Sequence, residues 1–144
     1  MNREQLLSIG ILKFTFIQNT GGAFGIAQNS TSMFVMSNLI ILGVIIRFMI
    51  TQKDNIDKKT YISLILILSG GFSNLADRIF RGFVVDFIDI NQIFWFPMFN
   101  IADICICTGC ILFAISLILF VRNNNKKIEE LKNGGTNERI YNEK

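Results

Sequence analysis

The sequence predicts a mainly α-helical membrane protein, with three transmembrane helices and a small extracytoplasmic β platform. Three long apolar stretches predict the helices, and two short runs with strand-like patterning predict the platform. Hydrophobic residues make up 51% of the 144 residues. A soluble bundle of this length has too few other residues to cover three such helices. The chain is therefore predicted to be an integral membrane protein, and its length allows one domain.

The three predicted helices cover residues 33–50, 60–76 and 101–121. Each is close to the roughly 20 residues that cross a hydrocarbon core. Arg47 interrupts the first only near its end, where a long side chain can extend to the interface. The third carries one charge, Asp103, close to its start. An ionisable residue at membrane depth is costly and indicates a functional site.

The two predicted strands cover residues 13–18 and 83–90, and Asp86 and Asp89 lie on the second. Between the first strand and the first helix, residues 19–25 contain paired glycines and an asparagine, which is typical of a tight turn. Both strands are expected on the same side of the membrane, where they can pair beside the helices to form the platform.

The basic residues predict the orientation. They cluster around the loop 51–59 and in the tail after the third helix, at Arg47, Lys53, Lys58, Lys59, Arg122, Lys126, Lys127, Lys132, Arg139 and Lys144. The positive-inside rule places both regions in the cytoplasm and residues 78–100 outside it. The chain then divides into a membrane-embedded domain, 1–122, and a polar cytoplasmic tail, 123–144, expected to be frayed and solvated. These flanks account for the net charge of +3, so nucleic-acid binding is not predicted.

The same orientation places residues 1–30 outside the cytoplasm, although no spanning segment precedes them. The apolar segment 6–12 is too short to cross a membrane, and no signal peptide is recognisable. We therefore expect a further transmembrane helix before Met1. The alternative is a three-helix protein with its N-terminus outside.

The chain contains no histidine, which excludes a Ser-His-Asp site, a Cys-His site and a histidine-ligated zinc. The three cysteines do not share one face of the third helix, so no metal and no other cofactor is expected. What remains is the pair of carboxylates, Asp86 and Asp103. Two close carboxylates do not both ionise cheaply, so one holds a proton while the other stays anionic. Such a pair can activate water and polarise a peptide carbonyl.

Two smaller groups accompany these aspartates. Asn74, Asp77 and Arg78 stand at i, i+3 and i+4 and face one side of the second helix. Asp77 and Arg78 are predicted to form a structural ion pair that fixes the segment carrying Asp86. Asn100 and Asp103 have the spacing of a helix N-cap and its N3 partner. A pure capping role for Asp103 therefore stands beside the catalytic one.

Four segments in order resemble lipoprotein signal peptidase (signal peptidase II): NTGGAF at 19–24, GGFSNLADR at 70–78, VVDF at 84–87 and FNIAD at 99–103. The resemblance covers residues 12–121. It implies that Asp86 and Asp103 are a catalytic dyad. It assigns supporting roles in the substrate site to Asn19, Asn74, Asp77, Arg78 and Asn100. It also implies the substrate, the signal peptide of a prolipoprotein, which is cut before a cysteine that already carries a diacylglyceryl group.

The resemblance further implies a multi-pass protein of the bacterial cell (inner) membrane, with its active site near the extracytoplasmic face. Family members have four spanning helices, and this sequence starts after the first. We expect a monomer whose partners are lipidated prolipoprotein signal peptides and membrane lipid. One alternative is a small transport or ion-conducting subunit, but its acidic residues would be spread across the membrane depth. The other is an inactive, truncated peptidase.

Overall fold

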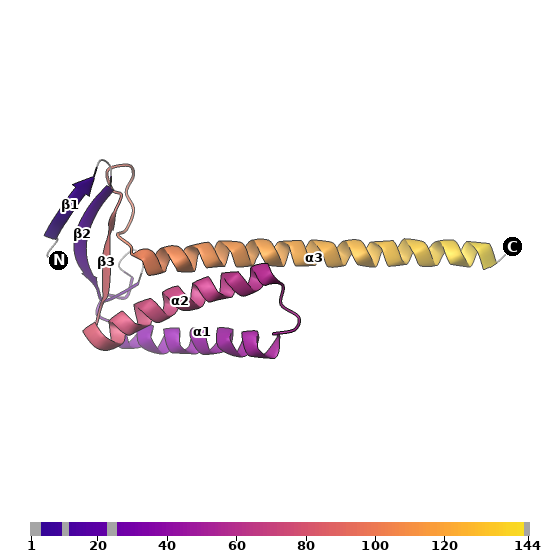
Figure 1. Ribbon diagram of the computed structural model, residues 1–144, viewed down its shortest axis with the longest axis horizontal. Helices are drawn as coiled ribbons and strands as arrows, with labels where there is room; N and C mark the ends of the chain where they lie inside the picture. Colours follow the sequence, from indigo (N-terminus) through magenta and orange to yellow (C-terminus); the bar gives the residue numbers. More distant parts are fainter. Residues whose placement is uncertain (1–3, 10–11, 23–25, 143–144) are drawn as a thin grey trace.

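The computed structural model describes residues 4–9, 12–22 and 26–142, with side chains described at 7–8, 13–22 and 26–132. A three-stranded sheet stands at one end of three helices (Figure 1). The elements in chain order are β1 (Glu4–Ile9), β2 (Leu12–Asn19), α1 (Thr31–Thr51), α2 (Lys58–Arg81), β3 (Val84–Asp89) and α3 (Ile101–Asn142). This architecture confirms the predicted fold class.

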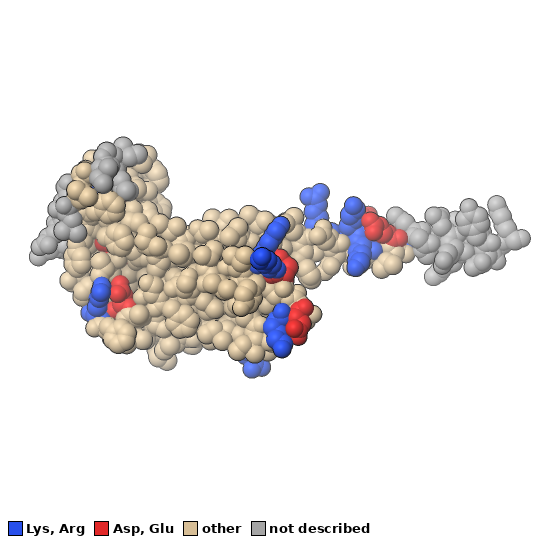
Figure 2. All heavy atoms as spheres, in the orientation of Figure 1, with Lys and Arg blue, Asp and Glu red and all other residues tan. Residues whose placement is uncertain are grey.

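All three helices are long and apolar enough to cross a membrane, with α3 contributing Ile101–Lys132 to its candidate span. Charged side chains gather near the two ends of the bundle and leave its middle bare on the visible face (Figure 2). Many large apolar side chains on α1 and α3 are exposed, such as Val44 and Ile118. In a membrane, the acyl chains of the lipids cover such an apolar surface. The helices therefore support the predicted integral membrane protein.

Helix α2 holds the bundle together, because it packs against both α1 and α3. A Cβ atom at Gly70 would collide with the carbonyl oxygen of Ala102 on α3 and lie 2.8 Å from Cγ1 of Ile106. Only glycine allows α3 to approach α2 this closely, as is common between membrane helices. On the other side of α2, Leu42 of α1 packs over Gly71 and is only 3% exposed.

The sheet is antiparallel in the order β1-β2-β3. Strands β2 and β3 correspond to the two predicted strands, and their register places Ile17 opposite Asp86. Strand β1 was not predicted, because its sequence, EQLLSI, does not alternate polar and apolar residues. Of the predicted turn 19–25, residues 23–25 lie outside the described residues. At its start the side chain of Asn19 accepts a hydrogen bond from the backbone N–H of Gly21 at 2.9 Å, as in an Asx turn.

Helix α3 continues as one element to Asn142, well beyond the other two helices (Figure 1). The expectation of a frayed tail after residue 122 was therefore wrong. Lysine, glutamate and leucine between residues 126 and 132 are good helix formers, so the helix propagates past the membrane span. Side chains from Asn123 to Lys132 are exposed, which agrees with the expectation that this segment is solvated.

Candidate active site

The two aspartates singled out by the sequence come together at the sheet end of the bundle. Asp86 lies on β3 and Asp103 lies in the first turn of α3. The chain returns from β3 to α3 alongside the strand: the N–H of Phe99 bonds to the carbonyl of Ile88 at 3.2 Å, and the N–H of Ile88 bonds back at 2.9 Å. This backbone pairing places the start of α3 beside Asp86.

Asn100 and Asp103 cap α3 reciprocally. The N–H of Asp103 donates to Oδ1 of Asn100 at 3.1 Å, and the N–H of Asn100 donates to Oδ2 of Asp103 at 3.0 Å. This is a capping box, so the capping interpretation of the spacing is confirmed. It uses only one oxygen of Asp103. The other, Oδ1, accepts a hydrogen bond from Nδ2 of Asn74 at 2.8 Å. Capping and a role in the site are therefore compatible.

Asp86 is almost completely buried, with 3% of its surface exposed. Its Oδ2 accepts from Nδ2 of Asn19 at 2.8 Å, and its Oδ1 accepts from Nδ2 of Asn100 at 2.9 Å. The same Nδ2 of Asn100 also donates to Oδ1 of Asn74 at 3.1 Å. A continuous hydrogen-bonded chain thus links Asp86 to Asp103 through two buried asparagines, Asn100 and Asn74.

The surroundings change the proton affinity of Asp86. Burial raises the pKa of Asp86 above its ordinary value of 3.8, and the negative charge of Asp103 acts in the same direction. Hydrogen bonds from Asn19 and Asn100 and the positive charge of Arg78 act in the opposite direction. Burial is the largest of these effects, so the protonated form of Asp86 is favoured relative to a solvated aspartate.

Asp77 forms its ion pair with Arg81, at 3.4 Å, and the predicted Asp77–Arg78 pair was wrong. Consecutive side chains on a helix point in directions about 100° apart, whereas residues four apart are neighbours. The second oxygen of Asp77 accepts a hydrogen bond from the N–H of Val85 at 3.3 Å. Asp77 thereby connects α2 to the residue that precedes Asp86.

Arg78 reaches the connection between β2 and α1. Its Nη2 donates to the carbonyl of Gly21 at 2.9 Å, and its guanidinium lies 5.1 Å from the ring centroid of Phe34. The cation stacked over an aromatic ring is held in place. Its Nε is buried and has no hydrogen-bond partner among the described residues.

A cavity of about 570 Å³ opens at these side chains. Five of the seven polar residues selected from the sequence line it, namely Asn19, Asn74, Arg78, Asp86 and Asp103. Asn100 and Asp77 do not line the cavity. Asn100 bonds to two residues that do line it, and Asp77 bonds to the residue before Asp86. The rest of the lining is mostly apolar and comes largely from residues 96–99 and from α3: Gly22, Val84, Ile90, Phe96, Pro97, Met98, Phe99, Ile104, Ile106, Cys107, Thr108 and Ile111. A polar corner in an apolar cavity of this size is typical of a ligand site.

The sequence analysis did not identify the α3 wall of this cavity. Cys107 and Ile111 lie one and two turns beyond Asp103, so the helical spacing from Asp103 is a signal that points to them. The contacts of Arg78 with Gly21 and Phe34 had no such signal. Among the described residues, no group of three or more Cys, Asp or Glu side chains is placed to hold a metal ion.

Known proteins resemble this chain in sequence and in structure. The family model described as signal peptidase (SPase) II matches residues 1–119. A lipoprotein signal peptidase of Clostridium acetobutylicum is 38% identical over 107 residues, which are 73% of this chain and 69% of that protein. One from Caldicellulosiruptor bescii is 41% identical over 110 residues, 76% of this chain and 69% of that protein. A solved bacterial membrane enzyme, determined by the in meso method, superimposes with a TM-score of 0.75 at 33% identity, over 83% of this chain and 74% of its own.

Proposed function

Because this chain belongs to the signal peptidase II family, we propose that it is an aspartic endopeptidase of the membrane. Its substrates are prolipoproteins modified with diacylglyceryl, and it removes their signal peptides by cutting before the lipidated cysteine. Its curated relatives are lipoprotein signal peptidases. Asp86 and Asp103 are the catalytic dyad, and no metal or cofactor takes part.

One observation carries the mechanism: Asp86 and Asp103 line one cavity and are joined by hydrogen bonds through Asn100 and Asn74. An ion path would place acidic groups along the membrane depth. Here they lie at one end of the helices, which supports hydrolysis rather than conduction. The asparagines orient both carboxyl groups and leave them facing the cavity.

The two carboxyl groups take different roles. Burial favours a proton on Asp86, whereas Asp103 accepts two N–H donors at the N-terminal end of α3, where negative charge is stabilised. Asp103 then removes a proton from a water molecule, and the water oxygen attacks the scissile carbonyl. Asp86 gives its proton to the carbonyl oxygen. The resulting diol collapses as the C–N bond breaks: the leaving nitrogen takes the proton from Asp103, and one hydroxyl of the diol returns a proton to Asp86.

The cavity suits a substrate that is held in the membrane. Its polar end contains the dyad, and the apolar residues Ile104 and Ile111 continue along the membrane-spanning part of α3. An extended, apolar signal peptide or an acyl chain is accommodated by such a wall. Arg78 also lines this cavity, so its positive charge is placed to attract a carbonyl oxygen of the substrate.

We place the dyad near the extracytoplasmic face of the bacterial cell membrane. The basic residues at the opposite end of the bundle, around the α1–α2 loop and along α3 (Figure 2), belong in the cytoplasm by the positive-inside rule. Residues 1–122 form the peptidase domain, and residues 123–144 form a polar cytoplasmic tail, in which α3 continues to Asn142. The protein works as a monomer.

The test replaces each aspartate separately by asparagine, Asp86→Asn and Asp103→Asn, in cells that carry a lipidated prolipoprotein. Both variants are expected to abolish cleavage while the protein still inserts, because an amide neither holds the shared proton nor acts as a base. Asp89→Asn is the matched control: it lies on the same strand, three residues from Asp86, and does not line the cavity. Normal processing by either dyad variant, or equal loss in the control, contradicts the assignment.

A further inference from the structure

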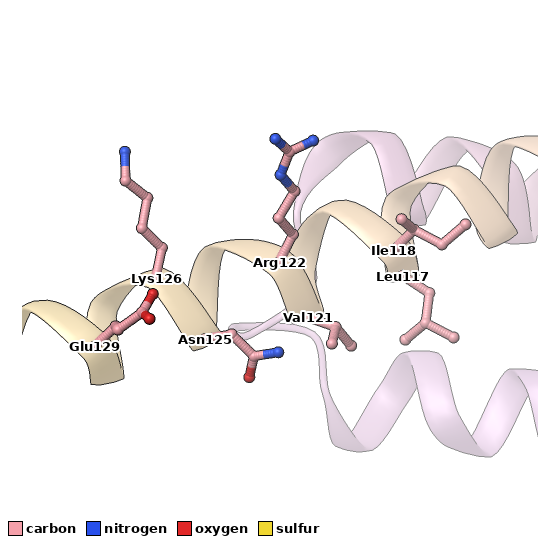
Figure 3. Close-up of a pocket in the computed structure, with 7 residues that line it drawn as sticks. All are labelled: Leu117, Ile118, Val121, Arg122, Asn125, Lys126 and Glu129. Atoms are coloured by element: carbon pink, nitrogen blue, oxygen red, sulfur yellow. The ribbon is translucent and has the colours of Figure 1, made fainter.

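A second hollow lies far from the dyad, on the part of α3 that leaves the bundle (Figure 3). It has a volume of about 690 Å³ and is lined by seven side chains of α3: Leu117, Ile118, Val121, Arg122, Asn125, Lys126 and Glu129. The hydrolytic mechanism uses none of them.

The depth of these residues in the membrane follows from the helix geometry. The segment 104–121 contains no charged residue, and at 1.5 Å per residue it spans roughly 27 Å. If Asp103 lies at one membrane–water interface, Arg122 therefore lies at the other. Leu117, Ile118 and Val121 therefore lie at the inner edge of the hydrocarbon, and Asn125 and Lys126 lie among the lipid headgroups.

The seven side chains form two parallel rows on the helix surface, each with a spacing of four residues. One row consists of Ile118, Arg122 and Lys126, and the other of Leu117, Val121, Asn125 and Glu129. Residues four apart form a continuous ridge, and side chains of both ridges line the hollow. Figure 3 shows Arg122 and Lys126 extending to the same side of α3. Each ridge changes from apolar to polar at the same depth.

The local charge favours an anion. Between residues 122 and 132 there are four basic residues (Arg122, Lys126, Lys127 and Lys132) and two acidic ones (Glu129 and Glu130), a net charge of +2. The α1–α2 loop at the same end adds Lys53, Lys58 and Lys59 against Asp54 and Asp57. Asp57 caps α2 and bonds to Thr60 and Ser116, so its carboxylate is directed towards the helices.

We propose that this hollow binds an anionic glycerophospholipid, with the phosphate between Arg122 and Lys126 and an acyl chain along Leu117, Ile118 and Val121. Each ridge has an apolar part beside the hydrocarbon and a polar part beside the headgroups. Such a lipid has its acyl chains and its phosphate in the same order. Clusters of basic residues next to a spanning helix attract anionic lipids. Asn125 adds an amide donor, and Glu129 at the far end keeps the phosphate on the membrane side of Lys126.

The experiment measures lipid retention by the purified full-length protein in neutral detergent, using native mass spectrometry. Phosphatidylglycerol is the probe, phosphatidylethanolamine and phosphatidylcholine are the lipids without net charge, and inorganic phosphate is the free anion. We expect phosphatidylglycerol to bind more tightly than the other two lipids and phosphate not to displace it. Equal retention of all three lipids, or displacement by inorganic phosphate at similar concentrations, overturns the proposal.

Two double variants locate the site. R122Q/K126Q is expected to weaken phosphatidylglycerol binding roughly 10- to 30-fold, from the loss of two charges near the lipid surface. K58Q/K127Q removes two charges at the same end of the bundle but none from the lining of the hollow, and is expected to weaken binding clearly less than R122Q/K126Q. R122K/K126R keeps both charges and is expected to retain the lipid. Equal weakening in the first two variants overturns the proposal.

Discussion

Nδ2 of Asn100 donates a hydrogen bond to Oδ1 of Asp86 over 2.9 Å, with both residues buried. Asn100 is also the N-cap partner of Asp103 and a donor to Asn74. The side chain of Asn100 thus caps α3 and orients the carboxyl group of Asp86 directly. Through Asn74 it also acts on the carboxyl group of Asp103. The arrangement of these two carboxyl groups therefore depends on a residue that does not line the cavity.

Replacing Asn100 by serine separates these roles. Serine is as good an N-cap as asparagine, so the cap of α3 is expected to remain, while the buried acceptors on Asp86 and Asn74 lose their donor. Serine cannot bridge Asp86 and Asn74 together. A hydrogen bond between neutral groups contributes about 0.5–1.5 kcal/mol, so kcat is expected to fall by up to roughly 10-fold. The measurement is steady-state cleavage of a lipidated prolipoprotein in detergent, and full activity with an intact fold contradicts this role.

The two contacts of Asp77 are expected to differ in value. Asp77→Ala leaves the N–H of Val85 without its acceptor and is expected to lower the free energy of unfolding by about 1–3 kcal/mol. Arg81→Gln removes only the ion pair, in which the arginine side chain is 57% exposed. Such pairs contribute about 0–1 kcal/mol. Thermal unfolding of both variants checks the comparison, and a larger loss in Arg81→Gln contradicts it.

Gly70 and Gly43 provide a matched pair in the helices. Gly70→Ala forces a methyl group against the backbone of Ala102 and is expected to cost about 1–3 kcal/mol of stability through overpacking. It is also expected to lower activity, because it displaces the first turn of α3. A Cβ at Gly43 meets nothing within 4 Å, so Gly43→Ala is expected to be neutral. Melting temperatures in one detergent decide between them, and two equal shifts would show that the close approach of α2 and α3 is unimportant.

The raised pKa of Asp86 predicts a pH dependence of stability. A buried carboxyl group that binds its proton more tightly in the folded protein stabilises the fold at pH values below its pKa in the unfolded chain. This contribution is lost as the pH rises through the folded pKa. The wild type is therefore expected to lose stability relative to Asp86→Asn as the pH rises above 3.8, the ordinary value. Melting temperatures of both proteins across the range from acidic to neutral pH test this, and a difference that grows in the opposite direction contradicts it.

In the proposed mechanism two carboxyl groups supply both the base and the acid, so cleavage is expected not to depend on a metal ion. Incubation of the purified enzyme with a strong chelator is expected to leave its rate unchanged. A large loss of activity that added zinc restores would require a metallopeptidase mechanism instead.

The sequence by itself determined the membrane class, the three helices and the pair of strands that carry Asn19 and Asp86. Apolar length and alternation are local properties, and they are readable without the fold. It also predicted which polar residues form the candidate site, since an aspartate or asparagine in an apolar chain is costly without partners. The i, i+3 spacing of Asn100 and Asp103 predicted the cap because both partners lie within one turn.

Only the tertiary structure decided which of these residues meet. The bond between Asn100 and Asp86, 14 residues apart, depends on the pairing of Phe99 with Ile88. Asp77 pairs with Arg81, and Arg78 bonds to the carbonyl of Gly21, because of the directions in which these side chains leave α2. Strand β1 is defined by its pairing with β2, because its own sequence lacks the alternating pattern. Partner choice over such separations is set by packing, which local sequence does not encode.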